Sequence, residues 1–472
     1  MTMELKKYSL GNTKWSLTEE GLESVAQQFT HPENKRRHYM VLDYQGGKVF
    51  IKSFLEKGLS GYIRHLISPR GKIEFQIGAR LDFLGISTPR VLAYGIGKYT
   101  SAVVEEYIDG QSLLYAIQKT ANRDDLLTLL ADFLKQLKQK HIRHNDLHLD
   151  NILMQGGRLY LIDLHKTKIK NRFNDADEMS NVTHALGMIY DDISDKERDV
   201  FFAQYGRDEK IRRKIEDHIR HLRKNWVINK KKRAFRNTSL LRVSDGYIYL
   251  KGAESEASGE FVTHIKKDKK VTVELYSDHI RKIFRHQRRL KTAWENHVVL
   301  TYLGSSAVPR PYYMKLPILS SDGYIAMEDM GYKGIEFDRF LDGKYDGMTF
   351  IERKMLIDSF TLFLRALFRQ RIIHRDMKGC NIFVLNHSHF VLLDVEDVAF
   401  EEISEETLKR MLVQLNTTIP RRISIKDRIR FFLKLTSSIR IDKKRLFRDI
   451  VRASLESDIV YEGIGGLKTE RW

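Results

Sequence analysis

The sequence contains the stretch His144-Asn-Asp-Leu-His-Leu-Asp-Asn151 and, 230 residues later, the stretch His374-Arg-Asp-Met-Lys-Gly-Cys-Asn381. Each stretch is followed by a short apolar strand, a polar turn and a second apolar strand that ends in an aspartate, Asp163 or Asp394. A single match to His-x-Asp-x-x-x-x-Asn is weak evidence, because short patterns arise by chance. Two matches with the same flanking pattern indicate an internal repeat, which is the first property of this chain to explain.

The repeat continues upstream of both stretches. Residues 44–52 read as a hairpin with a Gln-Gly-Gly turn, and residues 271–282 are their counterpart, so Lys52 and Lys282 fall on matching strands. Lys251, at the end of another apolar stretch, is an alternative to Lys282.

Helical stretches around Glu74 and Glu295 follow these lysines, and each leads to a Pro-Arg pair. The first copy has roughly ten extra residues between lysine and glutamate, which we interpret as an insertion at the surface. A glutamate on a helix is also typical of a solvated surface, so these two glutamates are weaker candidates than the loop aspartates.

The hydrophobic pattern of each copy predicts a small strand-rich lobe followed by a mainly helical lobe. Apolar residues recur at helical spacing over residues 124–140 and 351–370, immediately before the two His-x-Asp stretches. A basic segment, Arg223–Arg236, separates the copies. We therefore predict an α+β protein of two tandem domains, residues 1–225 and 226–472.

Composition narrows the class of protein. The chain has 472 residues, 42% of them hydrophobic and 10% aromatic, which excludes an intrinsically disordered protein and fits two or three domains. The single cysteine, Cys380, excludes a disulfide scaffold and a cysteine-based zinc site. Without an apolar stretch long enough for a membrane span or a signal peptide, we expect a cytoplasmic protein.

The repeated polar residues are those that phosphoryl transfer requires. That reaction needs a strand lysine for the nucleotide phosphates, a glutamate to hold it, a loop aspartate to accept the proton of the attacking hydroxyl, and oxygen ligands for Mg²⁺. Each copy supplies this set in the same order. The predicted catalytic residues are Asp146 and Asp376, the nucleotide-binding residues are Lys52, Glu74, Lys282 and Glu295, and the metal ligands are Asn151, Asp163, Asn381 and Asp394.

At these positions the chain resembles the protein-kinase-like superfamily. His374-Arg-Asp376 with Lys378 and Asn381 is similar to the protein-kinase catalytic loop, and residues 144–151 are similar to that of the small-molecule kinases. Leu161-Ile-Asp-Leu-His-Lys166 and Gly85-Ile-Ser-Thr-Pro-Arg90 resemble the bacterial lipopolysaccharide-core kinases. The resemblance implies two kinase-like domains, ATP and Mg²⁺ as cofactors, and phosphorylation of a heptose or Kdo sugar of the lipopolysaccharide inner core.

The chain also departs from the protein-kinase pattern. Neither lysine is preceded by Gly-x-Gly-x-x-Gly, and no Ala-Pro-Glu follows Asp163 or Asp394. The missing activation segment disfavours a protein substrate. The missing glycine loops leave open a second hypothesis, in which one or both copies are nucleotide-binding pseudokinases that regulate or scaffold another enzyme.

The excess of 81 Lys and Arg over 62 Asp and Glu gives a net charge of +19, which favours anionic partners. The densest basic runs are residues 223–236 and 279–291. Such runs are typical either of solvated helix faces or of a surface that contacts an anionic glycolipid at the inner membrane. We expect nucleotide and glycolipid partners with peripheral membrane contact, and no nucleic-acid partner, because no nucleic-acid-binding motif is present.

Overall fold

The computed structural model describes residues 5–32, 35–206, 208–317, 322–386, 388–437, 439 and 441–472. Within these residues the chain forms two compact units, Met1–His221 and Leu222–Trp472, which are called unit 1 and unit 2 below. Both contain helices and strands, so the mixed composition expected from the sequence is confirmed. None of the helices in the described ranges combines the length and the apolar content needed to cross a membrane.

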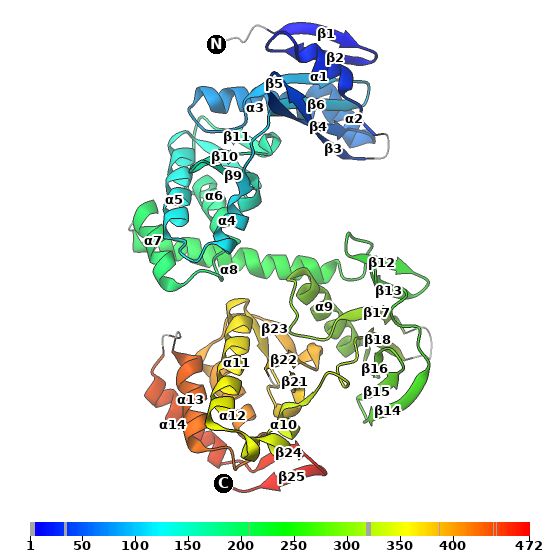
Figure 1. Ribbon diagram of the computed structural model, residues 1–472, viewed down its shortest axis with the longest axis vertical. Helices are drawn as coiled ribbons and strands as arrows, with labels where there is room; N and C mark the ends of the chain where they lie inside the picture. Colours follow the sequence, from blue (N-terminus) through cyan, green and yellow to red (C-terminus); the bar gives the residue numbers. More distant parts are fainter. Residues whose placement is uncertain are drawn as a thin grey trace. The chain divides into compact units, whose positions relative to one another are not determined.

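Unit 1 begins with an antiparallel sheet, drawn in blue in Figure 1. Its described strands have the order β1 (Lys6–Leu10), β2 (Thr13–Leu17), β5 (Val91–Ile96), β6 (Thr100–Glu106), β4 (Gly47–Leu55) and β3 (Arg37–Tyr44). The short helix α1 (Leu22–Gln28) follows β2. β3 and β4 form the expected hairpin, because Gln45 and Gly46 adopt the positive φ angles of 48° and 75° that a tight hairpin turn requires.

Helix α3 (Arg70–Phe83) packs on β5 and β6 and carries Glu74 toward the sheet. Its approach is close at Gly71, where a Cβ atom would overlap the backbone of Ala102 on β6. The backbone N–H of Gly71 also donates to Ser101 Oγ at 3.1 Å. The extra residues of the first copy include α2 (Leu59–Ile67), a helix between β4 and α3 that has no counterpart among the described residues between β16 and α9 of unit 2.

The rest of unit 1 is mainly helical and has its own apolar core. The expected helix over residues 124–140 is observed as α5, and α5 packs against α7. The helices are α4 (Leu113–Lys119), α5 (Asp124–Gln139), α6 (Asp175–Gly187), α7 (Asp195–Tyr205) and the first part of α8 (Glu209–Lys232), which continues into unit 2 from Leu222. The short strands are β7 (Gln111–Ser112), β8 (Ile142–His144), β9 (Ile152–Gln155), β10 (Arg158–Leu161) and β11 (Thr167–Ile169).

Unit 2 repeats the arrangement with a larger sheet. The order of its described strands is β12 (Leu241–Ser244), β13 (Tyr247–Leu250), β17 (Pro311–Lys315), β18 (Gly323–Met327), β16 (Ile280–Phe284), β15 (Val271–Tyr276) and β14 (Phe261–Lys267). Helix α9 (Gln287–Tyr302) packs on β16 and β18, and the buried Trp294 lies in the core beneath the sheet.

The helical half of unit 2 has a separate apolar core. Figure 1 shows its helices in yellow to red. They are α10 (Phe337–Lys344), α11 (Phe350–Arg369), α12 (Glu405–Asn416), α13 (Ile425–Thr436) and α14 (Lys443–Leu455), with the strands β19 (Gly334–Glu336), β20 (Ile372–His374), β21 (Ile382–Leu385), β22 (His389–Leu392), β23 (Val398–Phe400), β24 (Ile459–Gly463) and β25 (Gly466–Glu470).

The two basic runs are not continuous exposed surfaces. Much of the run at 223–236 lies on α8, where Lys230 Nζ is 3.6 Å from the centroid of the Tyr302 ring. In the run at 279–291, His279 is fully buried and Lys282 is 8% exposed on β16. Part of each run therefore packs within unit 2 and is not available to an external partner.

The close contact at Gly71 predicts a specific loss of stability. We expect Gly71→Ala to lower the free energy of unfolding by about 1–3 kcal/mol, since the added methyl group has no room against β6. Gly187→Ala is the matched control, because its Cβ would lie 3.8 Å from the nearest atom, in ordinary contact with Ile219. Chemical denaturation of the full chain measures both, and equal stability of the two variants would contradict the predicted overlap.

Candidate active site

The buried lysine of unit 1 lies between two carboxylates. Lys52 on β4 donates to Glu74 Oε1 on α3 at 2.7 Å, and its ammonium also pairs with Glu105 on β6. Lys52 is 6% exposed, Glu74 is 0% exposed and Glu105 is 1% exposed. The structure therefore brings the sequence-predicted pair together and adds Glu105, which the sequence analysis did not select.

The electrostatics of this cluster follow from burial and pairing. Burial opposes the charged form of Lys52, but the carboxylates of Glu105 and Glu74 outweigh it and raise the pKa of the lysine. Burial also opposes ionisation of Glu74, whose pKa is nevertheless lowered, mainly by Lys52. For Glu105 burial prevails and raises the pKa to about 7. The Lys52 ammonium is thus charged and held in place.

The loop with Asp146 is fixed by backbone bonds on both sides. β8 pairs with β11, and the backbone N–H of His144 donates to Asn181 on α6 at 3.0 Å. The Asn151 side-chain amide donates to the carbonyl oxygen of Asp146 at 2.8 Å. This bond uses the amide nitrogen of Asn151, so that its side-chain Oδ1 remains for another ligand.

Asp163 stands at the bend after β10. Its φ of 59° lies in the left-handed region, which aspartate tolerates better than most residues. Its Oδ1 lies 3.0 Å from His165 Nδ1, and the same ring nitrogen lies 3.5 Å from Glu74 Oε2. Despite burial, His165 and Lys166 lower the pKa of Asp163.

Lys166 connects the carboxylates of Asp146 and Asp163 in unit 1. Its ammonium pairs with Asp146 and lies 3.5 Å from Asp163 Oδ2. His148 Nε2 lies 2.7 Å from the other oxygen of Asp146. Against the opposing effect of burial, Lys166 and His148 lower the pKa of Asp146. The sequence analysis assigned no role to Lys166 or His148, although their spacing from the two aspartates was available as a signal.

The oxygen atoms present suit a divalent cation. One ligand atom each from Glu74, Asp163 and His165 lies within 4.8 Å of the others. Carboxylate and amide oxygens, as in Asp163 and Asn151, are the ligands that Mg²⁺ prefers. The fully buried second oxygen of Glu74 lies 3.5 Å from His165 Nδ1 and belongs to this cluster. These residues therefore fit a divalent cation.

Unit 2 pairs its lysine in a different way. Lys282 Nζ donates to Asp394 Oδ1 at 2.5 Å and to Glu396 Oε2 at 2.9 Å. Arg289 on α9 donates to the other oxygen of Glu396 at 3.1 Å. Burial opposes the charge of Lys282, but Asp394 and Glu396 raise its pKa. Lys251, the alternative strand lysine, instead donates to the carbonyl oxygen of Thr238.

The expected pairing of Glu295 with Lys282 is not found. Glu74 lies nine residues before the last residue of α3, whereas Glu295 lies seven before the last residue of α9, and Ala293 holds the equivalent position. Two residues correspond to about 200° around a helix, so Glu295 lies on the opposite face. Burial raises the pKa of Glu295, and the cations that oppose this effect are Lys231 and Lys291, not Lys282.

The second His-x-Asp loop keeps the geometry of the first. β20 pairs with β23, and Asn381 Nδ2 donates to the carbonyl oxygen of Asp376 at 2.8 Å. Lys378 Nζ lies 2.9 Å from Asp376 Oδ1, in the place that His148 takes in unit 1. Asp394 again adopts a left-handed φ, at 50°. The sequence analysis did not predict Glu396 as a partner of Lys282. Its position two residues after Asp394 is the feature of the sequence that could have indicated it.

Most of unit 1 is similar to a known protein family. Residues 23–205 match the model of the lipopolysaccharide kinase (Kdo/WaaP) family. The Kdo/WaaP match includes Lys52, Glu74, Asp146, Asn151 and Asp163, all in unit 1, and does not extend to unit 2. It shows the resemblance read from the sequence and supports a phosphotransferase.

Solved structures that resemble part of the chain share little sequence identity with it. The structure "WaaP in complex with acyl carrier protein" is 19% identical, with 42% of this chain and 92% of that chain covered and a TM-score of 0.33. A structure of WbdD with the kinase inhibitor LY294002 is 16% identical, with 41% and 45% covered and a TM-score of 0.28. The chain thus spans less than half the length of the WbdD chain. No curated protein matches the chain significantly.

The partners of Lys282 predict which glutamate matters for stability. We expect Glu396→Gln to lower the free energy of unfolding by about 1–3 kcal/mol, because a buried charged hydrogen bond is weakened. Glu295→Gln, on the outer face of α9, should change it by less than about 0.5 kcal/mol. Thermal unfolding of the two full-length variants measures this difference, and a larger loss for Glu295→Gln would reverse the assignment.

The environment of Cys380 predicts a pH profile. Burial is the main cause that raises the pKa of its thiol to about 11. Because the thiolate is the nucleophile, roughly one thiol in a thousand is reactive at pH 8. We expect alkylation by iodoacetamide, followed by mass spectrometry, to be slow at pH 8 and to accelerate about tenfold per pH unit up to pH 10. A rate that levels off near pH 8.5 would show an ordinary exposed thiol.

Proposed function

We propose that unit 1 is an ATP- and Mg²⁺-dependent kinase that phosphorylates a sugar hydroxyl, of heptose or Kdo, in the lipopolysaccharide inner core. The observation that carries this proposal is that Lys52, Glu74, Asp163 and Asp146 converge within the segment that matches the Kdo/WaaP family. The combination of a buried, charged lysine with ionised carboxylates is what nucleotide phosphates and a metal need.

In this mechanism the chain positions groups and neutralises charge. Asp146 accepts the proton of the attacking hydroxyl, and its low pKa keeps it ionised before the reaction. Lys52, held by Glu74, binds the nucleotide phosphates. Asn151 and Asp163 would hold Mg²⁺, which when bound neutralises charge on the phosphates. Lys166 lies between Asp146 and Asp163, so its charge would lie between the attacking hydroxyl of the sugar and the bound nucleotide.

We propose further that residues 226–472 form a second kinase-like domain after a first at residues 1–225. Support comes from the repeated loop geometry of Asp376 and Asn381 and from the pairing of Lys282 with Asp394. In place of a glycine loop, the hairpin of β14 and β15 carries Lys266 and Lys267 at the end of β14 and Lys269 and Lys270 in its turn. Against the opposing effect of burial, Lys282 is the main cause that lowers the pKa of Asp394, and Lys266 adds to it. This hairpin would therefore supply positive charge to nucleotide phosphates.

A second candidate function for unit 2 is regulatory nucleotide binding without catalysis. The observations that favour it are the absence of unit 2 from the family match and the alanine at position 293 where unit 1 has Glu74. For the protein as a whole we propose an anionic glycolipid acceptor and a place at the cytoplasmic face of the inner membrane, with no nucleic-acid partner. The net charge of +19 supports anionic partners.

The test for unit 1 is phosphate transfer from γ-labelled ATP to dephosphorylated lipopolysaccharide core by the full chain. We expect Asp146→Asn to lower kcat by about 10²–10⁴-fold, because the proton acceptor is lost. Asp150→Asn is the matched control, since Asp150 is exposed in the same turn. An unchanged kcat in Asp146→Asn would refute catalysis by this loop.

The same assay separates the two hypotheses for unit 2. If unit 2 is catalytic, Asp376→Asn removes one labelled product and leaves that of unit 1. If it is regulatory, this variant keeps every product, whereas Lys282→Met weakens a second nucleotide-binding event seen by calorimetry. Asp346→Asn, at a carboxylate whose side chain is 68% exposed, is the control for charge removal. A single nucleotide-binding event, unchanged in Lys282→Met, would contradict both.

A further inference from the structure

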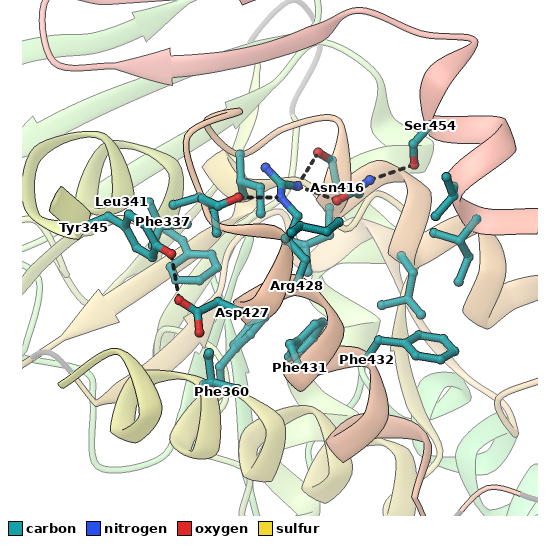
Figure 2. Close-up of a pocket in the computed structure, with 18 of the residues that line it drawn as sticks. Phe337, Leu341, Tyr345, Phe360, Asn416, Asp427, Arg428, Phe431, Phe432 and Ser454 are labelled. Carbon is teal, nitrogen blue, oxygen red and sulfur yellow. Dashed lines mark hydrogen bonds between the residues drawn. The ribbon is translucent and has the colours of Figure 1, made fainter. Parts of the chain in front are cut away.

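The helical half of unit 2 contains a cavity of about 250 Å³ between helices α10, α11, α12, α13 and α14. Figure 2 shows the rings of Phe360, Phe431 and Phe432 around it, together with two hydrogen-bonded polar groups, Tyr345 with Asp427 and Arg428 with Asn416 and Ser454. Its wall is almost entirely apolar. The cavity belongs to the helical core and is separate from the residues around Asp376 and Lys282.

We expect a cavity of this size to bind a ligand. Protein interiors are packed as densely as organic crystals, and the cost of an apolar void grows with its volume. An engineered apolar cavity of about 150 Å³ stays free of water and binds benzene. The larger cavity of unit 2 is equally unsuited to water, because few polar groups line it. An apolar ligand therefore fits it better than solvent does.

The cavity opens to the surface through apolar side chains. Ile425, the first residue of α13, is 62% exposed, and Leu455, the last residue of α14, is 59% exposed, yet both also line the cavity. Large apolar residues at the mouth extend the apolar path from the interior to the solvent. An apolar path of this kind suits a hydrocarbon chain that enters end first.

The polar side of the cavity carries excess positive charge. Arg353 lines it, and its buried Nε–H has no hydrogen-bond partner. The nearest acid is Asp427, 4.0 Å from that nitrogen, and Asp427 already accepts the Tyr345 hydroxyl at 2.7 Å and pairs with Arg430.

Arg428 also lines the cavity and adds a second positive charge. Its guanidinium donates to the carbonyl oxygens of Ile423 at 3.1 Å and Pro420 at 2.7 Å, and to Asn416. Within the described part of the chain, no carboxylate lies at ion-pair distance from Arg428. An anionic group at this side would therefore meet two arginines and an unused donor.

We propose that this cavity binds one acyl chain of an anionic lipid. The hydrocarbon lies among the aromatic rings, and the carboxylate or phosphate head lies beside Arg353 and Arg428. The ligand is either a free fatty acid or one chain of a membrane lipid, since both present the same chemistry. The proposal does not depend on the kinase activity, so its failure would leave that activity untouched.

Trp472 reports occupancy directly, because its ring lines the cavity. The other three tryptophans, Trp15, Trp226 and Trp294, do not line the cavity. We expect 9,10-dibromostearate to quench the tryptophan fluorescence of the full chain with saturation, since bromine quenches indole only at short range. Trp472→Phe should lose this saturable part. Absence of saturable quenching, or equal quenching in Trp472→Phe, would overturn the proposal.

Two variants test the cavity itself with cis-parinaric acid as the fluorescent probe. Leu455→Trp should obstruct the mouth and weaken binding by about tenfold or more. Leu433→Trp is the matched control, because Leu433 on α13 is 53% exposed and does not line the cavity. Val451→Phe, which fills the cavity from α14, provides a second variant if Leu455→Trp does not fold. Equal affinity in the folded variants and the control would refute the site.

The head group is tested by competition. We expect oleate to displace the probe better than oleyl alcohol, and Arg353→Gln to reduce this preference. Vesicles of phosphatidylglycerol distinguish the two sources: displacement by vesicles indicates a membrane lipid, whereas displacement by oleate alone indicates a free fatty acid. Equal displacement by the acid and the alcohol in the unmodified chain would contradict an anionic head.

Discussion

The arrangement of each site depends on one buried ammonium. A lysine on a central strand is removed from water, and this is costly unless carboxylates surround it. In unit 1 the carboxylates come from helix α3 and strand β6, as Glu74 and Glu105. They fix α3 against the sheet, which is why the close approach at Gly71 matters for the site. In unit 2 both carboxylates come from one turn, as Asp394 and Glu396.

This difference changes what holds each site together. In unit 1 the lysine is tied to a helix, and His165 connects that helix to Asp163. In unit 2 the turn after β22 supplies both the lysine partners, and Arg289 on α9 reaches the same turn through Glu396. Glu74, the carboxylate that unit 1 places on helix α3, is thus replaced in unit 2 by Glu396, which lies two residues after Asp394. The same buried charge is satisfied from two different elements.

The two units also differ in the apolar cores of their helical halves. Each helical half has its own apolar core, but in unit 2 the core contains the cavity near Trp472. Its polar side combines Arg353 and Arg428 with a single carboxylate, Asp427. A lipid chain there would link unit 2 to lipid chemistry independently of the residues at Asp376. The two units would then share the geometry of the His-x-Asp loop, but they would bind different ligands.

The sequence by itself determined the repeat, the strand and helix types, and the loops that bring Asp146 toward Asn151 and Asp376 toward Asn381. These features depend on short-range spacing, which is visible along the chain. Tertiary structure decided the partners of the buried lysines, because a helix position is defined by rotation. Glu295 is displaced by two residues, about 200°, from the inward face. The pairing of Lys52 with Glu105 and that of Lys282 with Glu396 join residues far apart in the sequence, so only the folded chain shows them.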